Sequence, residues 1–391
     1  MTPEPYRFPL NRFMSDKAFN RIQKFSKNLK TPCLVLDLDI IKSKYKELKK
    51  ELPASTIFYA LKANPHDEIV LLLNDLGSHF DVASTHELDQ LLRLGVSPER
   101  ISYGNTIKKR DDVEYFFDKG VRLFVTDSFE DLRNIADKAP GANVFFRILT
   151  DGTGSDWPLS RKFGAHPDVV YSLILKAKEW GLSPFGISFH VGSQQRDIGQ
   201  WDEALARCKY LFDAASEAGI RLKMINLGGG FPANYLEQTN PVINYTSEIK
   251  RFVEEDFADE HPLIYLEPGR SIVGDAGVLV SEIIRVSKKT KSSYQPWVFL
   301  DVGKFGGLIE TIDESIRFPI YVDKAGKEEE VILAGPTCDS MDILYEKFKY
   351  TVPHSIEEGD RVYILTTGAY TQSYCSINFN GFPPIRAYII K

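Results

Sequence analysis

The chain has 391 residues, of which 43% are hydrophobic and 26% charged, and its formal net charge is −6 at pH 7. This length accommodates one large domain and a smaller second one, and the composition is that of an ordinary globular protein. No basic stripe is present to neutralise phosphates, so nucleic acid is not an expected partner. The four cysteines show no CxxC spacing, the N-terminal stretch has no apolar signal core and no segment is long enough to cross a bilayer, so we expect a cytoplasmic protein without membrane contact.

Short β-rich runs alternate with helical patterns through the middle of the chain. Amphipathic stretches such as HELDQLLRLG and DDVEYFFDKG lie between the runs and end at Gly95 and Gly120. The runs occupy residues 57–63, 79–84, 101–106, 121–128, 143–150, 185–192, 223–230 and 262–270. This alternation predicts parallel strands with helical crossovers, and eight strands close a (β/α)8 TIM barrel over residues 37–270. An open doubly wound sheet is the alternative, but the early turns lack GxGxxG and no reversal point is visible.

The alternation of β-rich runs and helical patterns ends after residue 270. Runs such as YQPWVFLDVG, FPIYVDKAG and DRVYILTTGAYT are β-rich and joined by turn residues, with few helical patterns. We predict an antiparallel β domain, a sandwich or small barrel, over residues 271–391. A (β/α)8 barrel offers no packing partner for residues 1–36, so we assign them to the same β domain. The charge run KEEE at 327–330 is expected to be a solvated turn.

Polar residues gather where the predicted barrel strands end, which is where the active site of such a barrel lies. Lys62 follows the apolar run FYAL, and His190 and Glu267 follow two later runs. Taken singly, each has a plain structural explanation, since a lysine at a strand end is usually a solvated cap and a histidine is more often a hydrogen-bonded core residue. The combination is harder to explain by packing.

The run MINLGGG points to a phosphate. Consecutive bare N–H groups at Gly228–Gly230 can bind an anion, and Arg270 at the end of the next run could clamp the same group. A lysine on the first strand and a phosphate site on the last two suggest pyridoxal 5′-phosphate, which bonds a lysine amine and needs an acidic partner for its ring nitrogen. Glu267 is the carboxylate at the right strand end. No metal ion is expected.

The motifs YALKAN, HFDVAS, SFHVGSQ, NLGGGFP, EPGR, GPTCDSMD and GAYTQSYCSINFNGF resemble the fold-type III pyridoxal-phosphate decarboxylases. That family has an alanine-racemase-like barrel and acts on ornithine, lysine, arginine or diaminopimelate. The resemblance runs from about residue 30 to 385, and it is strongest to the bacterial ornithine or ornithine/lysine decarboxylases.

The resemblance implies a role for each matching barrel residue. Lys62 would form the Schiff base, Glu267 would pair with the pyridine nitrogen and His190 would stack on the ring. The further cofactor-binding residues that it implies are Asp81, Arg147, Ser193, Gly228, Gly229, Gly230, Gly269, Arg270 and Tyr370. A carboxylate at position 267 favours decarboxylation over racemisation, because it keeps the ring nitrogen protonated.

The resemblance also implies a homodimer with active sites shared at the interface. From the β domain of the partner, Cys338 would donate a proton to the substrate Cα, Asp339 would bind the distal amine and Phe379 would wall the site. Asp313 or Glu314 would supply a second carboxylate for that amine, and the sequence does not decide between them.

The expected activity is decarboxylation of L-ornithine to putrescine and CO2, with L-lysine left open as a second substrate. Diaminopimelate or arginine decarboxylation is the alternative. A distal carboxylate would need an arginine, for which Arg317 is the nearby candidate, but the adjacent acids oppose it. A non-catalytic regulatory homologue is the alternative from another class, and the retention of Lys62, Glu267 and Cys338 disfavours it.

Overall fold

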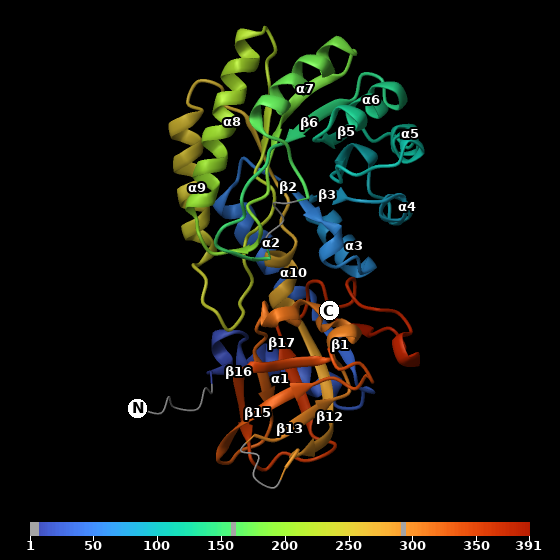
Figure 1. Cartoon of the computed structure of the whole chain (residues 1–391), viewed down its shortest axis with the longest axis vertical. Helices are drawn as coiled ribbons and strands as arrows, with labels where there is room; N and C mark the ends of the chain where they lie inside the picture. The colour runs from blue at the N-terminus through green and yellow to red at the C-terminus, as the bar shows by residue number, and fades with distance from the viewer. Residues whose placement is uncertain (1–7, 158–161, 291–294) are drawn as a thin grey trace. The chain divides into compact units, whose positions relative to one another are not determined.

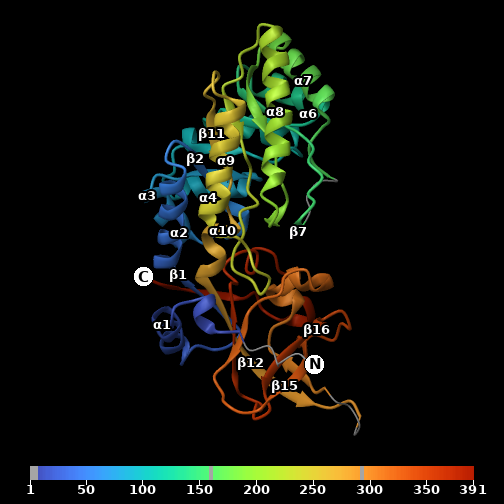
Figure 2. The same ribbon diagram turned by 90° about the vertical axis from the view of Figure 1, so that its left-hand side faces the viewer.

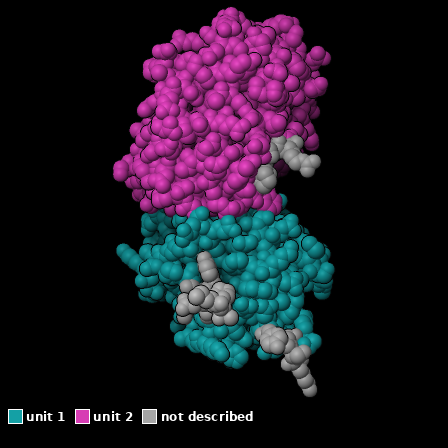
Figure 3. Space-filling model, turned by 60° about the vertical axis from the view of Figure 1, so that its left-hand side comes forward, with its two compact units in different colours: residues 1–41, 233–238, 272–391 teal, residues 42–232, 239–271 magenta. Residues whose placement is uncertain are grey.

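The computed structural model describes residues 8–157, 162–290 and 295–391. The chain divides into two compact units, shown in Figure 3. Unit 1 comprises Met1–Ile41, Ala233–Gln238 and Ile272–Lys391, and unit 2 comprises Lys42–Pro232 and Thr239–Ser271. The domain boundaries drawn from the sequence stay a prediction, and these units differ from them most in giving residues 233–238 to unit 1.

Unit 2 is built around a closed barrel of eight strands in which every neighbouring pair is parallel. Each run predicted from the sequence overlaps one barrel strand. The strands are β2 (Thr56–Ala60), β3 (His79–Val82), β4 (Ile101–Tyr103), β5 (Leu123–Thr126), β6 (Asn143–Arg147), β8 (Ser183–Ser188), β10 (Met224–Asn226) and β11 (Leu263–Leu266). The predicted barrel is confirmed, and the open doubly wound sheet is wrong.

Helices connect the barrel strands and lie outside them (Figure 1). They are α2 (Leu38–Glu51), α3 (Asp67–Asp75), α4 (Thr85–Arg93), α5 (Arg110–Asp118), α6 (Phe129–Lys138), α7 (Pro167–Glu179), α8 (Gly199–Glu217) and α9 (Val242–Asp256). Figures 1 and 2 both show α8 and α9 side by side. Gly95 and Gly120 follow α4 and α5 with φ of 80° and 97°, the left-handed conformation that ends a helix.

The barrel strands end earlier than predicted. β2 stops at Ala60, and Lys62 lies in a single 3-10 turn, η2 (Leu61–Ala63). The Ala60 N–H leaves the ladder and donates to the carbonyl of Pro268 at 3.1 Å. Apolar runs mark burial, and burial continues into this turn after strand pairing has stopped.

Apolar side chains close the barrel interior below the strand ends. Val125, Phe145 and Met224 form a buried cluster, against which Leu123, Phe185 and Tyr265 pack. A small antiparallel pair in the same unit, β7 (Ser155–Trp157) with β9 (Ser193–Gln195), is not foreseen by any sequence pattern.

Unit 1 contains an eight-stranded sheet whose longest path is β14-β17-β12-β13-β15-β16, with β1 paired to β12 and β18. Its strands are β1 (Cys33–Asp37), β12 (Gly277–Ser287), β13 (Trp297–Leu300), β14 (Ile320–Val322), β15 (Glu328–Ala334), β16 (Ile343–Pro353), β17 (Arg361–Leu365) and β18 (Arg386–Ile390). The N-terminal strand β1 thus joins the β unit, as expected for residues 1–36.

The predicted β domain is present, and most of its strand pairs are antiparallel. β1 pairs with β18 and β13 pairs with β15 in parallel, so the sheet is mixed. The chain between β13 and β15 is long enough for the crossover that parallel pairing requires. Glu328–Glu330, expected as a turn, open β15 opposite Thr351–Pro353.

Short helical segments complete the chain: η1 (Leu10–Arg12), α1 (Asp16–Ser26), η3 (Pro98–Arg100), α10 (Arg270–Val273), η4 (Gly274–Ala276), η5 (Lys304–Leu308), η6 (Ile309–Glu314) and η7 (Phe379–Gly381). Within the described ranges, no helix is both long and apolar enough to span a membrane.

Candidate active site

The C-terminal strand ends of unit 2 bring together the predicted barrel residues. Lys62 is exposed in the turn after β2, Asp81 is buried in β3 and Arg147 ends β6. His190 follows β8, and Glu267 follows β11. Barrel register sets Asp81 beside Ala60 of β2, next to the lysine turn.

The glycine triplet after β10 offers bare backbone N–H groups. A Cβ at Gly229 would lie 2.8 Å from the carbonyl oxygen of Glu267 and 3.1 Å from Nε2 of His190. Gly228 and Gly230 have φ of 64° and 95°, which L side chains rarely adopt. Within the described residues, the N–H groups of Gly229 and Gly230 donate to no protein acceptor. Such paired donors form a site for an anion.

Arg270 follows β11, the barrel strand that comes after the glycine triplet in the chain. Its side chain is only 4% exposed, and its Nε donates to Ser193 Oγ at 3.1 Å. A guanidinium group suits a phosphate, because the phosphate can accept two parallel N–H bonds from it. The structure thus brings together Ser193 and Arg270, which are 77 residues apart in the chain. Their role in binding a phosphate stays a prediction.

Glu267 accepts a hydrogen bond from a residue that the sequence analysis did not select. Asn226 Nδ2 donates to Glu267 Oε1 at 2.5 Å, and Asn226 Oδ1 accepts the N–H of Gly228 at 2.9 Å. In the sequence, Asn226 is marked only by its position in NLGGG, two residues before the glycine triplet.

Two carboxyls and three basic groups share this strand-end region. Burial raises the pKa of Asp81 well above its usual range, and the charge of Glu267 adds to that shift while Lys62 opposes it. Burial lowers the pKa of Arg147, against the opposing carboxylates, among which Glu267 acts most strongly. Asp81 Oδ1 is buried without a hydrogen-bond partner. The site therefore favours a protonated Asp81.

His190 is neutral, and its tautomer follows from its contacts. Burial lowers the pKa of His190 well below its usual range, and the charges of Arg147 and Lys62 act in the same direction. Its Nδ1 accepts the N–H of Gly192 at 3.0 Å, so the ring proton is on Nε2. An uncharged imidazole suits stacking on a flat ring.

Gly269 allows the lysine turn to pack closely. A Cβ at this position would lie 2.7 Å from Cβ of Ala63 and 3.3 Å from Cβ of Ala60, on either side of Lys62. Any larger residue would push the turn away from the end of β11. Gly269 thus supports the lysine through the backbone, without a side-chain contact of its own.

These features fit the predicted cofactor. Pyridoxal phosphate requires an anion site, an amine, an acidic partner for the ring nitrogen and an apolar or neutral group for the ring face. Gly229, Gly230 and Arg270 would hold the phosphate, Lys62 is the amine and Glu267 is the acid. The donor set of the barrel mouth therefore matches the group in type and in charge.

Unit 1 carries the remaining predicted residues on exposed loops. Cys338 is an exposed thiol whose N–H donates to Asn380 Oδ1 at 3.1 Å. Asp339 is exposed, and its Oδ1 accepts the N–H of Met341 at 2.8 Å. Tyr370 is half-buried in the same unit, with a φ of 56°.

A buried carboxylate, Asp342, shapes the loop that carries Cys338 and Asp339. It is 3% exposed and accepts Lys304 N at 2.8 Å, Thr337 N at 3.1 Å and Thr337 Oγ1 at 2.7 Å. In the sequence, Asp342 is visible only as the last residue of the motif GPTCDSMD. No neighbouring residue indicates that its carboxylate is buried.

Glu314 and Asp313, the two candidate carboxylates for the distal amine, have different surroundings in the structure. Glu314 accepts three backbone N–H bonds from β16, at Glu346, Lys347 and Phe348, each 2.7 Å long. Burial raises the pKa of Glu314, but these three hydrogen bonds and the charge of Arg317 outweigh burial and lower it. Asp313 is exposed. Glu314 thus has a structural role, since its carboxylate accepts three backbone hydrogen bonds from β16.

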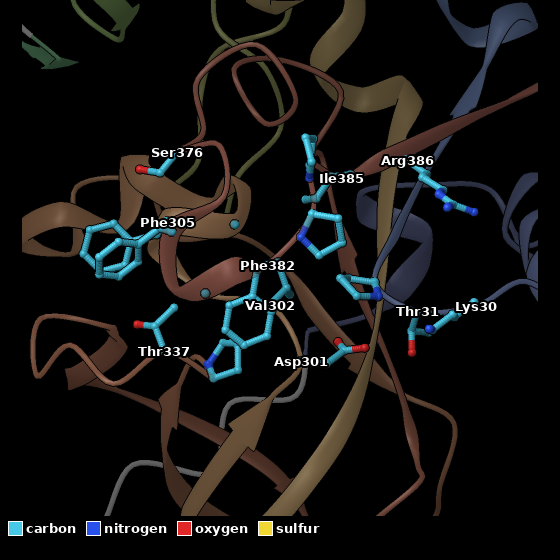
Figure 4. A pocket seen from close by; sticks show the side chains of 17 residues that line it. Lys30, Thr31, Asp301, Val302, Phe305, Thr337, Ser376, Phe382, Ile385 and Arg386 are labelled. Carbon is cyan, nitrogen blue, oxygen red and sulfur yellow. The ribbon is translucent and has the colours of Figure 1, made fainter.

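Unit 1 has an apolar pocket with an empty volume of about 800 Å³, lined among others by Phe305, Thr337 and Phe382 (Figure 4). Phe379 also lines this pocket. The rings of Phe379 and Phe305 are 4.8 Å apart between centroids and tilted by 49°. Thr337, which precedes Cys338, lines the same pocket. The predicted wall residue and the predicted thiol therefore share one surface of unit 1.

A profile of the family described as "Pyridoxal-dependent decarboxylase, pyridoxal binding domain" matches residues 38–274. The lysine/ornithine decarboxylase of Selenomonas ruminantium is 35% identical over 362 residues, covering 92% of this chain and 90% of that protein.

Two solved structures extend the comparison. A lysine/ornithine decarboxylase from Vibrio vulnificus, complexed with cadaverine, superposes with a TM-score of 0.87 at 30% identity, covering 97% of this chain and 100% of that one. The arginine decarboxylase of Paramecium bursaria Chlorella virus gives a TM-score of 0.87 at 27% identity, covering 96% of this chain and 100% of that one. The likeness thus spans both units.

Proposed function

The chain belongs to the pyridoxal-dependent decarboxylases, and on that premise we propose that it converts L-ornithine to putrescine and CO2, with L-lysine as a second substrate. Its similarity to lysine/ornithine and ornithine decarboxylases supports pyridoxal-phosphate-dependent decarboxylation of basic amino acids. The finer proposal is supported by the exposed carboxylates Asp313 and Asp339 on unit 1, in a chain whose unit 2 carries Lys62 and Glu267 at the barrel strand ends.

The residues of unit 2 bind and orient. When bound, pyridoxal phosphate supplies an aldehyde that exchanges amines and a protonated ring that takes up the electrons left behind by CO2. Lys62 provides the first amine from an exposed turn, where its side chain can swing aside once it is displaced. Glu267 keeps the ring nitrogen protonated, and neutral His190 covers the ring face without opposing that charge.

The thiol of Cys338 is proposed as the acid that returns a proton to the substrate Cα. A thiol can serve because its proton is readily moved by its surroundings. We propose that Cys338 and Asp339 act in the barrel of a partner subunit, in a head-to-tail homodimer. The hydrogen bond that the Cys338 N–H donates to Asn380 Oδ1 would hold the thiol-bearing loop in place.

The proposed distal site favours a cation. A diamino acid brings an ammonium into a partly desolvated pocket and needs a carboxylate there. Diaminopimelate would need a basic partner instead, but Arg317 donates to Glu237 at 2.9 Å and lies over the ring of Phe348. Arginine decarboxylation stays the alternative, supported by the likeness to the viral enzyme.

Asp339→Asn is expected to raise KM for ornithine by about ten- to a hundred-fold, because a lost charge-assisted hydrogen bond costs about 1.5–3 kcal/mol. The contact is present in ground and transition states alike, so kcat should change far less. Asp313→Asn should act in the same direction. Glu314→Gln is the matched control in position and chemistry, and it should lower thermal stability while leaving KM within about twofold.

Steady-state kinetics with ornithine test this. Wild-type KM in both Asp339→Asn and Asp313→Asn would remove the physical basis of the diamino-acid proposal. Identification of putrescine by chromatography, with stoichiometric CO2, tests the proposed reaction itself.

A further inference from the structure

Both ends of the Asn226 amide are occupied. Its Nδ2 donates to Glu267 Oε1 at 2.5 Å, and its Oδ1 accepts the N–H of Gly228 at 2.9 Å. The side chain is 2% exposed, so water does not compete for either group. Because the Gly228 N–H must face a carbonyl oxygen, the amide has one allowed orientation, and its NH2 group can only donate to Glu267.

A third hydrogen bond closes the arrangement. The N–H of Glu267 donates to the carbonyl of Gly228 at 2.8 Å. Asn226, Gly228 and Glu267 therefore form a ring of three hydrogen bonds that joins the end of β10 to the end of β11. Gly228 has a φ of 64°, and a Cβ there would overlap the carbonyl oxygen of Phe189, so no other residue fits this ring.

The ring fixes the orientation of the Glu267 carboxyl group, because its Oε1 accepts a hydrogen bond from a group that can only donate. Glu267 acts electrostatically on Asp81 from β3 and on Arg147 from β6. Lys62 from η2 acts on Asp81, and His190 after β8 is acted on by Arg147 and Lys62. Asn226 donates a hydrogen bond to Glu267, whereas Asp81 Oδ1 is buried without a hydrogen-bond partner and burial raises the pKa of Asp81.

We propose that Asn226 is a positioning residue that couples the two ends of the cofactor site. Through Gly228 it fixes the glycine triplet that would hold the phosphate, and through Glu267 it fixes the orientation of the carboxyl group that would meet the ring nitrogen. The cofactor follows from the family, whereas the role of Glu267 rests on the proposed function.

Two substitutions separate these effects. Asn226→Asp keeps an oxygen for the Gly228 N–H but replaces the donor to Glu267 with a second acid. Asn226→Leu has a similar size and removes both bonds. Asn143→Asp is the matched control, because it adds the same charge at the start of β6, at the opposite end of the barrel strands.

Two readouts on the full-length protein need no substrate. The first is the dissociation constant of pyridoxal phosphate from the apo protein, followed by absorbance. Asn226→Leu should weaken it by about tenfold or more, as expected for a lost hydrogen bond to a charged group, and Asn226→Asp by no more than about threefold. The second is the pH at which the visible band of the bound cofactor changes on the acid side. That pH should rise by about one unit or more in Asn226→Asp, since two acids in contact hold a proton more tightly.

Wild-type behaviour of Asn226→Asp in the acid-side titration, or wild-type cofactor affinity in Asn226→Leu, would overturn the proposal. If Asn226→Leu does not fold, the titration of Asn226→Asp alone decides. A change of the same size in Asn143→Asp would also overturn it, because the effect would then be charge alone. A protein that shows the expected shifts yet releases no CO2 would refute the proposed function and leave the role of Asn226 standing.

Discussion

Lys62→Ala is expected to lower turnover by a factor on the order of 10⁴ or more, as loss of a covalent nucleophile does in other enzymes. Lys62 is the amine on the turn after β2, and no second lysine of the predicted site can replace it. The side chain is exposed, so the barrel loses little packing and the melting temperature should change by no more than a few degrees. Borohydride reduction followed by mass spectrometry should attach the cofactor to Lys62 in the wild type and to nothing in the variant.

Lys178→Ala on α7 is the matched control, since it removes an exposed lysine from the outside of the same barrel. It should retain wild-type turnover and the cofactor adduct. A Lys62→Ala protein that turned over ornithine at the wild-type rate would refute the assignment of Lys62.

Mixing two inactive variants should restore activity if active sites are shared between subunits. Lys62→Ala is defective in unit 2 and Cys338→Ala in unit 1. Random exchange makes about half of the dimers hybrid, and each hybrid has one site with both residues intact, so about a quarter of wild-type activity should return.

Lys62→Ala mixed with Glu267→Ala is the control for that experiment. Both changes then lie in unit 2, so every hybrid site keeps one defect and no activity should return. If differently tagged subunits are shown to exchange while the Lys62→Ala and Cys338→Ala mixture stays inactive, the shared site is wrong.

Most of the barrel could be predicted from the sequence because strand–helix alternation repeats along the chain. The strand ends could not, since the apolar run that includes Phe58 and Leu61 records burial, which continues through the lysine turn. The parallel pairing of β1 with β18 joins segments near opposite ends of the chain, and no local pattern reports such a contact. The sequence analysis also does not predict β16, whose backbone N–H groups donate to Glu314.

The site residues divide in the same way. Lys62, Glu267 and the glycine triplet are unusual residue types at strand ends, so their chemistry is visible locally. Asn226 is an ordinary residue type whose meaning depends on Glu267, 41 residues away. Glu314 and Asp313 are adjacent acids that only the backbone of β16 distinguishes.

The most direct test of basic amino-acid decarboxylation is kcat/KM for CO2 release from ornithine, lysine, arginine and diaminopimelate by the cofactor-loaded protein. We expect ornithine to give the highest value and lysine to follow within about 10- to 200-fold, since one methylene in a pocket is worth about 1–3 kcal/mol. Arginine and diaminopimelate should be lower than both. A highest value for diaminopimelate, or no CO2 from any of the four by protein with a bound cofactor, would contradict the proposed function.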